Sequence, residues 1–125
     1  MSYNITGFNV KVIKDLAISL DKLVSLAEDA NATIETHIDI VTKEITIELA
    51  ECSSITGTIE SLESDLLKIS KLNCIHDWSA HVMHNVLEPL FKTSTGELKA
   101  LTVWESGDSI CYLIVNNGVV TWKDI

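Results

Sequence analysis

The stretch ELKALTVWESGDSICYLIVNNGVVTWKD, residues 97–124, decides the fold class. It holds three largely apolar runs, and Asn117-Gly118, which joins the second run to the third, is the dipeptide most typical of a two-residue β-hairpin turn. We therefore expect three antiparallel strands at 97–105, 109–115 and 119–124. The middle run is apolar at successive positions, which predicts a central strand covered on both faces.

Upstream of these strands the spacing of the apolar residues changes several times. Residues 5–12 begin as an extended segment, and a helix follows that Asp15 would cap and Asn31 would end. Residues 32–49 alternate between apolar and polar side chains around a turn at Thr42-Lys43. This alternation predicts a hairpin with one apolar and one acidic face.

Two further helices are predicted between this hairpin and the C-terminal strands. The first covers 57–71, where Ile59, Leu62, Leu66 and Ile69 would form an apolar stripe. The second would run from Asp77 to about Leu87, with Pro89 ending or kinking it. The element order is then strand, helix, two strands, two helices, three strands. It predicts one α+β domain over residues 1–125, with a mainly antiparallel sheet of five to six strands and two to three helices packed on it.

The charge of the chain narrows the classes of partner. Eighteen acidic residues face nine basic ones, the formal net charge is −9, and every basic residue is a lysine. Arginine is the usual residue for binding phosphate groups and base edges, and this acidic chain has none. We therefore expect neither nucleic acid nor an anionic membrane surface as a partner. Eight of the acidic residues fall between Glu35 and Asp65, against Lys43 alone. Such a concentration is typical either of a solvated surface or of a surface that captures a basic protein.

The candidate partner-binding residues are the acidic side chains of the predicted hairpin and of the helix that follows it. They are Glu35, Asp39, Glu44, Glu48, Glu51, Glu60 and Glu63. Retaining like charges across a strand pair costs some tenths of a kcal/mol. A solvated face tolerates that cost. A site for a cation or a basic surface would also require such a group of like charges.

A second polar set lies on the predicted helix before Pro89. Asp77, His81, His84 and Glu88 are spaced by four, three and four residues, which places them on one helix face, and Cys74 and His76 lie just upstream. Histidine and carboxylate are metal ligands, so the set is a candidate metal site. It is also simply the polar face of an amphipathic helix, and no more than an adjacent pair could reach one ion.

The remaining features favour a cytoplasmic, non-enzymatic protein without a cofactor. Three widely spaced cysteines, and an N-terminus unlike a signal peptide, are typical of reduced thiols in a cytoplasmic protein. Motifs for dinucleotide, P-loop, serine hydrolase and zinc protease chemistry are missing from the sequence. Trp104 and Trp122 stand near strand ends, where an indole belongs either to the core or to an interface.

These observations lead to one hypothesis and two alternatives. The hypothesis is a small inhibitor or immunity-type protein that neutralises a basic partner, such as a toxin or nuclease, through an acidic face; a homodimer through the C-terminal sheet is compatible with it. The first alternative is a metal-binding protein or metal-dependent enzyme that uses His81, His84 and Glu88. The second is an obligate subunit with a structural role.

Overall fold

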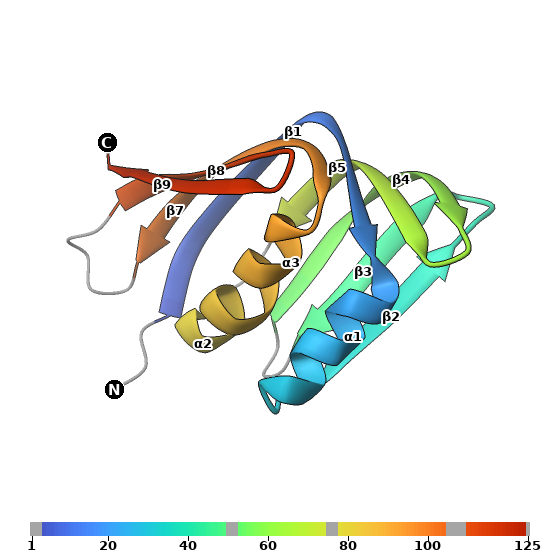
Figure 1. Cartoon of the computed structure of the whole chain (residues 1–125), viewed down its shortest axis with the longest axis horizontal. Coiled ribbons are helices and arrows are strands. Elements are labelled where there is room, and N and C mark those ends of the chain that lie inside the picture. The colour runs from blue at the N-terminus through green and yellow to red at the C-terminus, as the bar shows by residue number, and fades with distance from the viewer. Residues whose placement is uncertain (1–3, 50–52, 75–77, 105–109, 125) are drawn as a thin grey trace.

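An antiparallel sheet is the largest element of the computed structural model, which describes residues 4–49, 53–74, 78–104 and 110–124 (Figure 1). In this described part, eight strands follow one another in the order β2-β3-β4-β5-β1-β7-β8-β9, and a short β6 pairs with the beginning of β1. The strands are β1 (Asn4–Ser19), β2 (Ile34–Asp39), β3 (Glu44–Leu49), β4 (Ser53–Glu63), β5 (Leu66–Cys74), β6 (Trp78–Ser79), β7 (Thr95–Trp104), β8 (Ile110–Asn116) and β9 (Val119–Asp124). The α+β class and the antiparallel sheet are confirmed, whereas the number of strands exceeds the predicted five to six.

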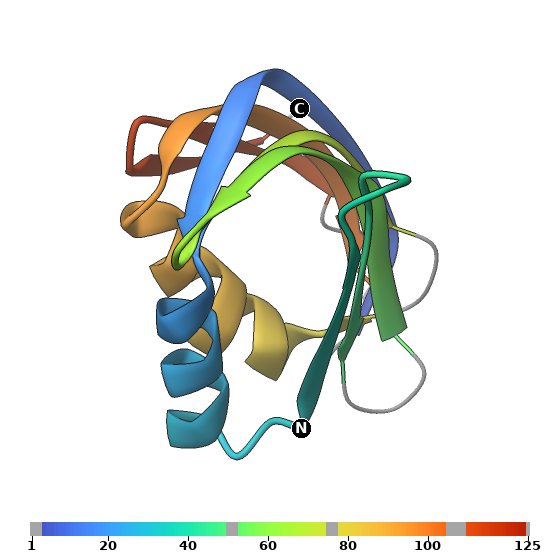
Figure 2. The same ribbon diagram turned by 90° about the vertical axis from the view of Figure 1, so that its right-hand side faces the viewer.

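The sheet is strongly curved, and Figure 2 shows the helices on its concave side. The long β1 pairs with β5 at its C-terminal end and with β7 along most of its length. Register shifts on either side of Lys14 mark irregularities of the kind that bend a strand and increase its twist. β1 therefore joins two halves of the sheet, one made of β2 to β5 and the other of β7 to β9.

The first helix, α1 (Leu20–Asp29), follows β1 directly, and its start is fixed by contacts from outside the helix. Ser19 Oγ accepts a hydrogen bond from Lys22 N at 3.1 Å, which caps the first turn. The Asp65 carboxylate, from the turn between β4 and β5, accepts hydrogen bonds from the Ser19 hydroxyl and from Asp21 N. These bonds hold the pKa of Asp65 below its ordinary value.

The predicted cap at Asp15 is therefore wrong, although the predicted end of the helix is close. Leu16, which the spacing placed in the helix, is fully buried near the end of β1, and Ile18 two residues later is buried on the same face of the strand. The helix ends at Asp29, and Asn31 follows in the left-handed conformation at φ 55°. Asparagine tolerates this conformation better than most residues, which explains why it makes a good stop.

The second helical segment runs through Pro89 without ending there. It consists of α2 (Ala80–Val82), a π-helical turn η1 (Met83–Leu87) and α3 (Glu88–Lys92). In the π-helical turn, Glu88 N donates to Met83 O, five residues back, and Pro89 then lies in the first turn of α3, where a proline is tolerated. The prediction that the helix ends near Leu87 is wrong, because this local change of register accommodates the proline.

The core lies between the concave face of the sheet and the two helical segments. Its fully buried side chains include Leu16, Leu67, Ile69, Leu98, Leu113 and Val115 from the sheet and Leu23, Met83, Val86 and Leu90 from the helices. Burying one such side chain stabilises the fold by about 1.5–3 kcal/mol. On the second helical segment, the face opposite the polar set is buried at Val82, Val86 and Leu90, as expected of an amphipathic helix.

The predicted helix over 57–71 is wrong, because this segment forms the β4–β5 hairpin. Every second residue of β4 is buried, at Ile55, Gly57 and Ile59. This period of two is that of a strand, and it decides the structure in place of the helix-like spacing of the apolar residues. Leu66, a member of that stripe, is 53 % exposed. The chain turns at Ser64, which adopts φ 55°, and Glu63 pairs with Leu66 across the turn. Two strands thus replace one helix, which accounts for the larger sheet.

The C-terminal three-stranded arrangement is confirmed. Asn117 at φ 46° and Gly118 at φ 84° make the two-residue turn between β8 and β9. The prediction that β8 is covered on both faces is wrong. Leu113 and Val115 are fully buried, but Ile110 is 45 % exposed on the opposite face, because the helices cover only the concave side.

Candidate functional site

Four of the predicted partner-binding residues lie together on the convex face of the β2–β3 hairpin. Glu35 pairs directly with Glu48, and Asp39 pairs directly with Glu44. Side chains alternate between the two faces of a strand, and Ile47 next to Glu48 points into the core, so these four carboxylates share the opposite face. All four are exposed. We call Glu35, Asp39, Glu44 and Glu48 the acidic hairpin face.

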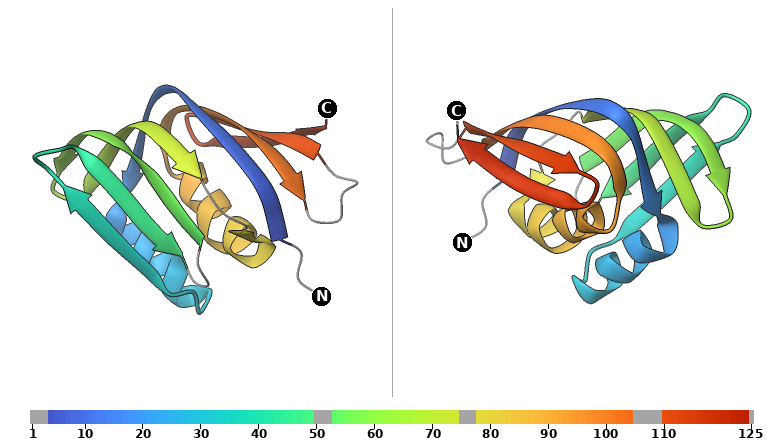
Figure 3. Two further views of the ribbon diagram at one scale, coloured as in Figure 1. Left: turned by 180° about the vertical axis from the view of Figure 1, so that it is seen from behind. Right: turned by 45° about the horizontal axis from the view of Figure 1, so that its top comes forward.

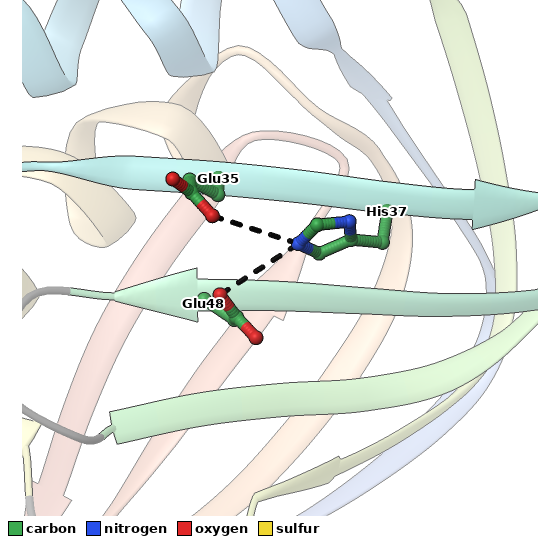
Figure 4. A group of neighbouring side chains, drawn as sticks. All are labelled: Glu35, His37 and Glu48. Atoms are coloured by element: carbon green, nitrogen blue, oxygen red, sulfur yellow. Dashed lines mark ion pairs between the residues drawn. The ribbon is translucent and has the colours of Figure 1, made fainter.

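A histidine lies between two of these carboxylates (Figure 4). His37 Nε2 is 3.7 Å from Glu35 Oε2 and 3.6 Å from Glu48 Oε2, and all three side chains are more than half exposed. Within the described residues, this is the set of three potential metal ligands whose donor atoms converge, all within 4.8 Å of one another. The sequence placed His37 on the acidic side of the hairpin, but the contact with Glu48 depends on the cross-strand register.

Asp39 also has a structural role in the turn that follows β2. Its Oδ1 accepts hydrogen bonds from Val41 N at 2.9 Å and from Thr42 N at 3.1 Å. The bonds from Thr42 and Val41 lower the pKa of Asp39, which therefore stays ionised to lower pH than an ordinary aspartate. The turn it holds presents Ile40 and Val41 to solvent, 69 % and 92 % exposed.

The other predicted partner-binding residues do not join this group. Glu60 and Glu63 are exposed but lie in the β4–β5 hairpin, beyond the Glu44–Thr58 pair at which the β3–β4 ladder ends. Glu51 lies outside the described residues. The acidic stretch of the sequence is therefore divided between two hairpins, and the closest grouping is the one on β2 and β3.

The ion pairs that the acidic hairpin face makes within the described residues involve His37 and no lysine. A shallow depression of about 350 Å³ adjoins the face; it is lined by Glu44, Ile45, Thr46, Thr56, Gly57, Thr58, Lys71 and Asn73. The carboxylate of Glu44 and the threonine hydroxyl groups around it offer hydrogen-bond acceptors, and Lys71 adds a positive charge to the same lining.

The candidate metal residues on the second helical segment are engaged in contacts within the protein. His81 Nε2 is 2.7 Å from Ala30 O, which ties this segment to the end of α1, and Asn85 Nδ2 donates to His81 O at 2.9 Å. His84 Nδ1 lies 3.7 Å from Glu88 Oε2. Asp77 and His76 lie outside the described residues, as does the side chain of Cys74. In the described part of the chain, the two histidines and Glu88 do not converge as a set of three ligands.

Glu88 instead belongs to an aromatic cluster that joins the helix to the C-terminal strands. Trp122 Nε1 donates to Glu88 Oε1 at 2.6 Å. The His84 ring stacks on Trp104 with centroids 5.5 Å apart, and the two indole rings are 5.9 Å apart. Both indoles are half-buried and pack against the core. The sequence offered no signal for this cluster, because it joins a helix to strands 16 or more residues away.

Comparison of the chain with models of protein families, with curated proteins and with solved structures finds no match. Among the described residues, no helix is both long enough and apolar enough to cross a membrane.

Proposed function

We propose that this protein binds a basic protein partner through the acidic hairpin face, in the manner of an inhibitor or immunity protein that neutralises a toxin or nuclease. One observation carries the proposal: four exposed carboxylates project from one face of two paired strands, and no lysine of the described chain pairs with them. A field of one sign raises the rate of encounter with an oppositely charged protein by roughly 10- to 1,000-fold.

The cost of this arrangement supports the proposal. Glu35 and Glu48 are directly opposed, and so are Asp39 and Glu44. Like charges directly opposed on a sheet destabilise it, by roughly 0.2–1 kcal/mol per pair. A basic partner would remove this repulsion on binding, so that part of the electrostatic gain appears only in the complex. The depression beside Glu44, which Lys71 also lines, gives a polar side chain of the partner a place to enter.

The proposal is tested by reversing charges in two matched variants. The first carries Glu35→Lys, Glu44→Lys and Glu48→Lys and keeps Asp39, because Asp39 holds the turn. The control carries Glu28→Lys, Asp29→Lys and Asp124→Lys, which changes the net charge equally but on exposed positions of α1 and β9. We expect the wild type and the control to retain the same basic protein from an extract of the source cell, with release at high salt. The first variant should bind it at least about a hundredfold more weakly, the loss typical of several charged contacts.

The outcome that contradicts the proposal is equally concrete. If the first variant captures the same protein as the control, or if salt does not release it, the acidic hairpin face does not carry the binding. Circular dichroism and denaturation of both variants show whether each is folded.

Cation binding is the second candidate function, and the convergence of Glu35, His37 and Glu48 favours it over a site on the helix. All three ligands are more than half exposed, and a surface site of this kind lacks the packed outer shell that orients metal ligands. We therefore expect elemental analysis of untagged protein to find less than one equivalent of transition metal. A stoichiometric ion lost on His37→Ala would assign cation binding to the acidic hairpin face, and one lost on His84→Ala would assign it to the helix.

A further inference from the structure

The convex face of the other half of the sheet has the opposite character. Val10, Ala100 and Leu113 are aligned across β1, β7 and β8 and point into the core. The neighbouring rows therefore point outward. These two rows are Lys11, Lys99, Ile114 and Thr121, and Asn9, Leu101, Tyr112 and Lys123. We call Lys11, Lys99, Leu101, Tyr112, Ile114 and Lys123, together with Ile110, the basic sheet face.

Lysines and apolar side chains are interleaved on this face. Lys11 is directly opposed to Lys99, and Lys99 Nζ lies 4.3 Å from the centroid of the Tyr112 ring. Ile110 is 45 % exposed. At one end of the face, Lys14 is directly opposed to Glu97 across β1 and β7. An opposed pair of lysines, like an opposed pair of glutamates, is destabilising unless an anionic surface lies over it.

The acidic hairpin face carries the matching features. Its four carboxylates supply the opposite charge, and the turn at its end presents Ile40 and Val41, which are the most exposed large apolar side chains of the described residues. The two hydrogen bonds to Asp39 restrain this turn, which lowers the conformational entropy that it loses when it docks. The chain therefore presents an acidic surface with an apolar tip, and a basic surface with apolar gaps.

The two surfaces cannot meet within one molecule. β2 and β3 lie at one end of the strand order, and β7 to β9 lie at the other. Figure 3 shows these two groups at opposite ends of the sheet in both views. An encounter between the surfaces therefore requires two molecules.

We propose that this protein associates with itself, with the acidic hairpin face and the Ile40-Val41 tip of one copy docked on the basic sheet face of a second copy. Charge complementarity selects the contact and fixes its orientation, and the burial of Ile40 and Val41 among Leu101, Ile110 and Tyr112 slows its release. If both copies use both surfaces, the dimer is reciprocal and closed; if the rotation does not close, a chain of copies forms. A basic partner on the acidic hairpin face would compete with the second copy for that face.

Analytical ultracentrifugation of the full chain over a range of concentrations, at low and at high salt, tests this. We expect the wild type to associate reversibly and high salt to weaken the association. One variant, Glu44→Lys with Glu48→Lys, and another, Lys11→Glu with Lys99→Glu, should each raise the dissociation constant at least about tenfold, as expected when an interfacial charge is reversed. Val41→Ser should weaken association without changing the net charge, and Lys22→Glu with Lys92→Glu, on the helices, is the matched control.

The decisive measurement mixes the two reversed variants. Each carries one altered and one native surface, so in the mixture the native acidic hairpin face of the Lys11→Glu, Lys99→Glu variant meets the native basic sheet face of the other variant. The mixture should therefore form a heterodimer when neither variant associates alone. A wild type that stays monomeric at low salt, a dimer that survives both reversals, or a mixture that does not associate would each overturn the proposal. Lys11→Glu with Lys99→Glu should leave the capture of a basic partner intact, so failure of this inference is distinguishable from failure of the proposed function.

Discussion

Gly96→Ala is expected to destabilise the protein by about 3 kcal/mol or more, one of the largest effects of any conservative substitution in the chain. Gly96 adopts φ +99°, a conformation that residues with a Cβ rarely take. A Cβ there would also lie 2.1 Å from Asp15 O and 2.9 Å from Leu16 Cα, both backbone atoms of β1. The strand could relieve this contact only by moving the centre of the sheet.

The position of Gly96 explains why this close approach exists. It lies where the register between β1 and β7 shifts, between the pairs Lys14–Glu97 and Ala17–Thr95. Asn117 N donates to Gly96 O at 2.9 Å, so displacement of Gly96 would also disturb the turn between β8 and β9.

Urea denaturation of Gly96→Ala measures the effect, with Thr95→Ser as the control. Thr95 is exposed and adjacent, so its substitution should change the free energy of unfolding by no more than about 0.5 kcal/mol. A Gly96→Ala protein whose free energy of unfolding is within about 1 kcal/mol of the wild type, a third of the expected loss, would show that β1 does not pass so close to this residue.

The elements that sequence reasoning placed correctly are those whose signal is local. The Asn117-Gly118 turn needs only two adjacent residues in the left-handed conformation, and the alternation over 32–49 fixes which side chains share a face. Both signals are contained within one hairpin. The grouping of Glu35 and Glu48 on one face follows directly from that alternation.

The largest error arose where two periods fitted the same residues. Ile59, Leu62, Leu66 and Ile69 are spaced as on a helix, yet Ile59 and Ile69 also belong to the inner faces of two strands. Their neighbours in the sheet, β3 and β1, supply the burial that decides between the periods, and a local pattern does not contain those neighbours.

The basic sheet face was not predictable for a related reason. Its lysines lie on β1, β7 and β9, and Lys11 and Lys99 meet only because strands 88 positions apart pair in one register. Charge counted along the sequence shows the acidic stretch, because those residues are neighbours in the chain. The lysines are scattered along the sequence and are gathered only by the folding of the sheet.

Gly57→Ala separates the two interpretations of residues 57–71 by the size of its effect. Gly57 would be the first residue of the predicted helix, where glycine is among the favoured capping residues, so alanine there would change the free energy of unfolding by no more than about 1 kcal/mol. In the β4–β5 hairpin, Gly57 is buried opposite Leu72, and a Cβ would lie 2.1 Å from Lys71 O and 3.1 Å from Leu72 Cδ2. Because a backbone oxygen cannot rotate away, the strands would have to separate.

We therefore expect Gly57→Ala to lower the free energy of unfolding by about 2–4 kcal/mol, the range typical of overpacking combined with distortion of a strand pair. Thermal and urea denaturation measure it, and Thr58→Ser, at the adjacent exposed position, is the control. A Gly57→Ala protein whose free energy of unfolding is within about 1 kcal/mol of the wild type would favour the helix and argue against the β4–β5 hairpin. Because β3 pairs with β4, the β2–β3 hairpin would then lose its neighbour in the sheet. The pairing that stabilises the acidic hairpin face would be lost with it.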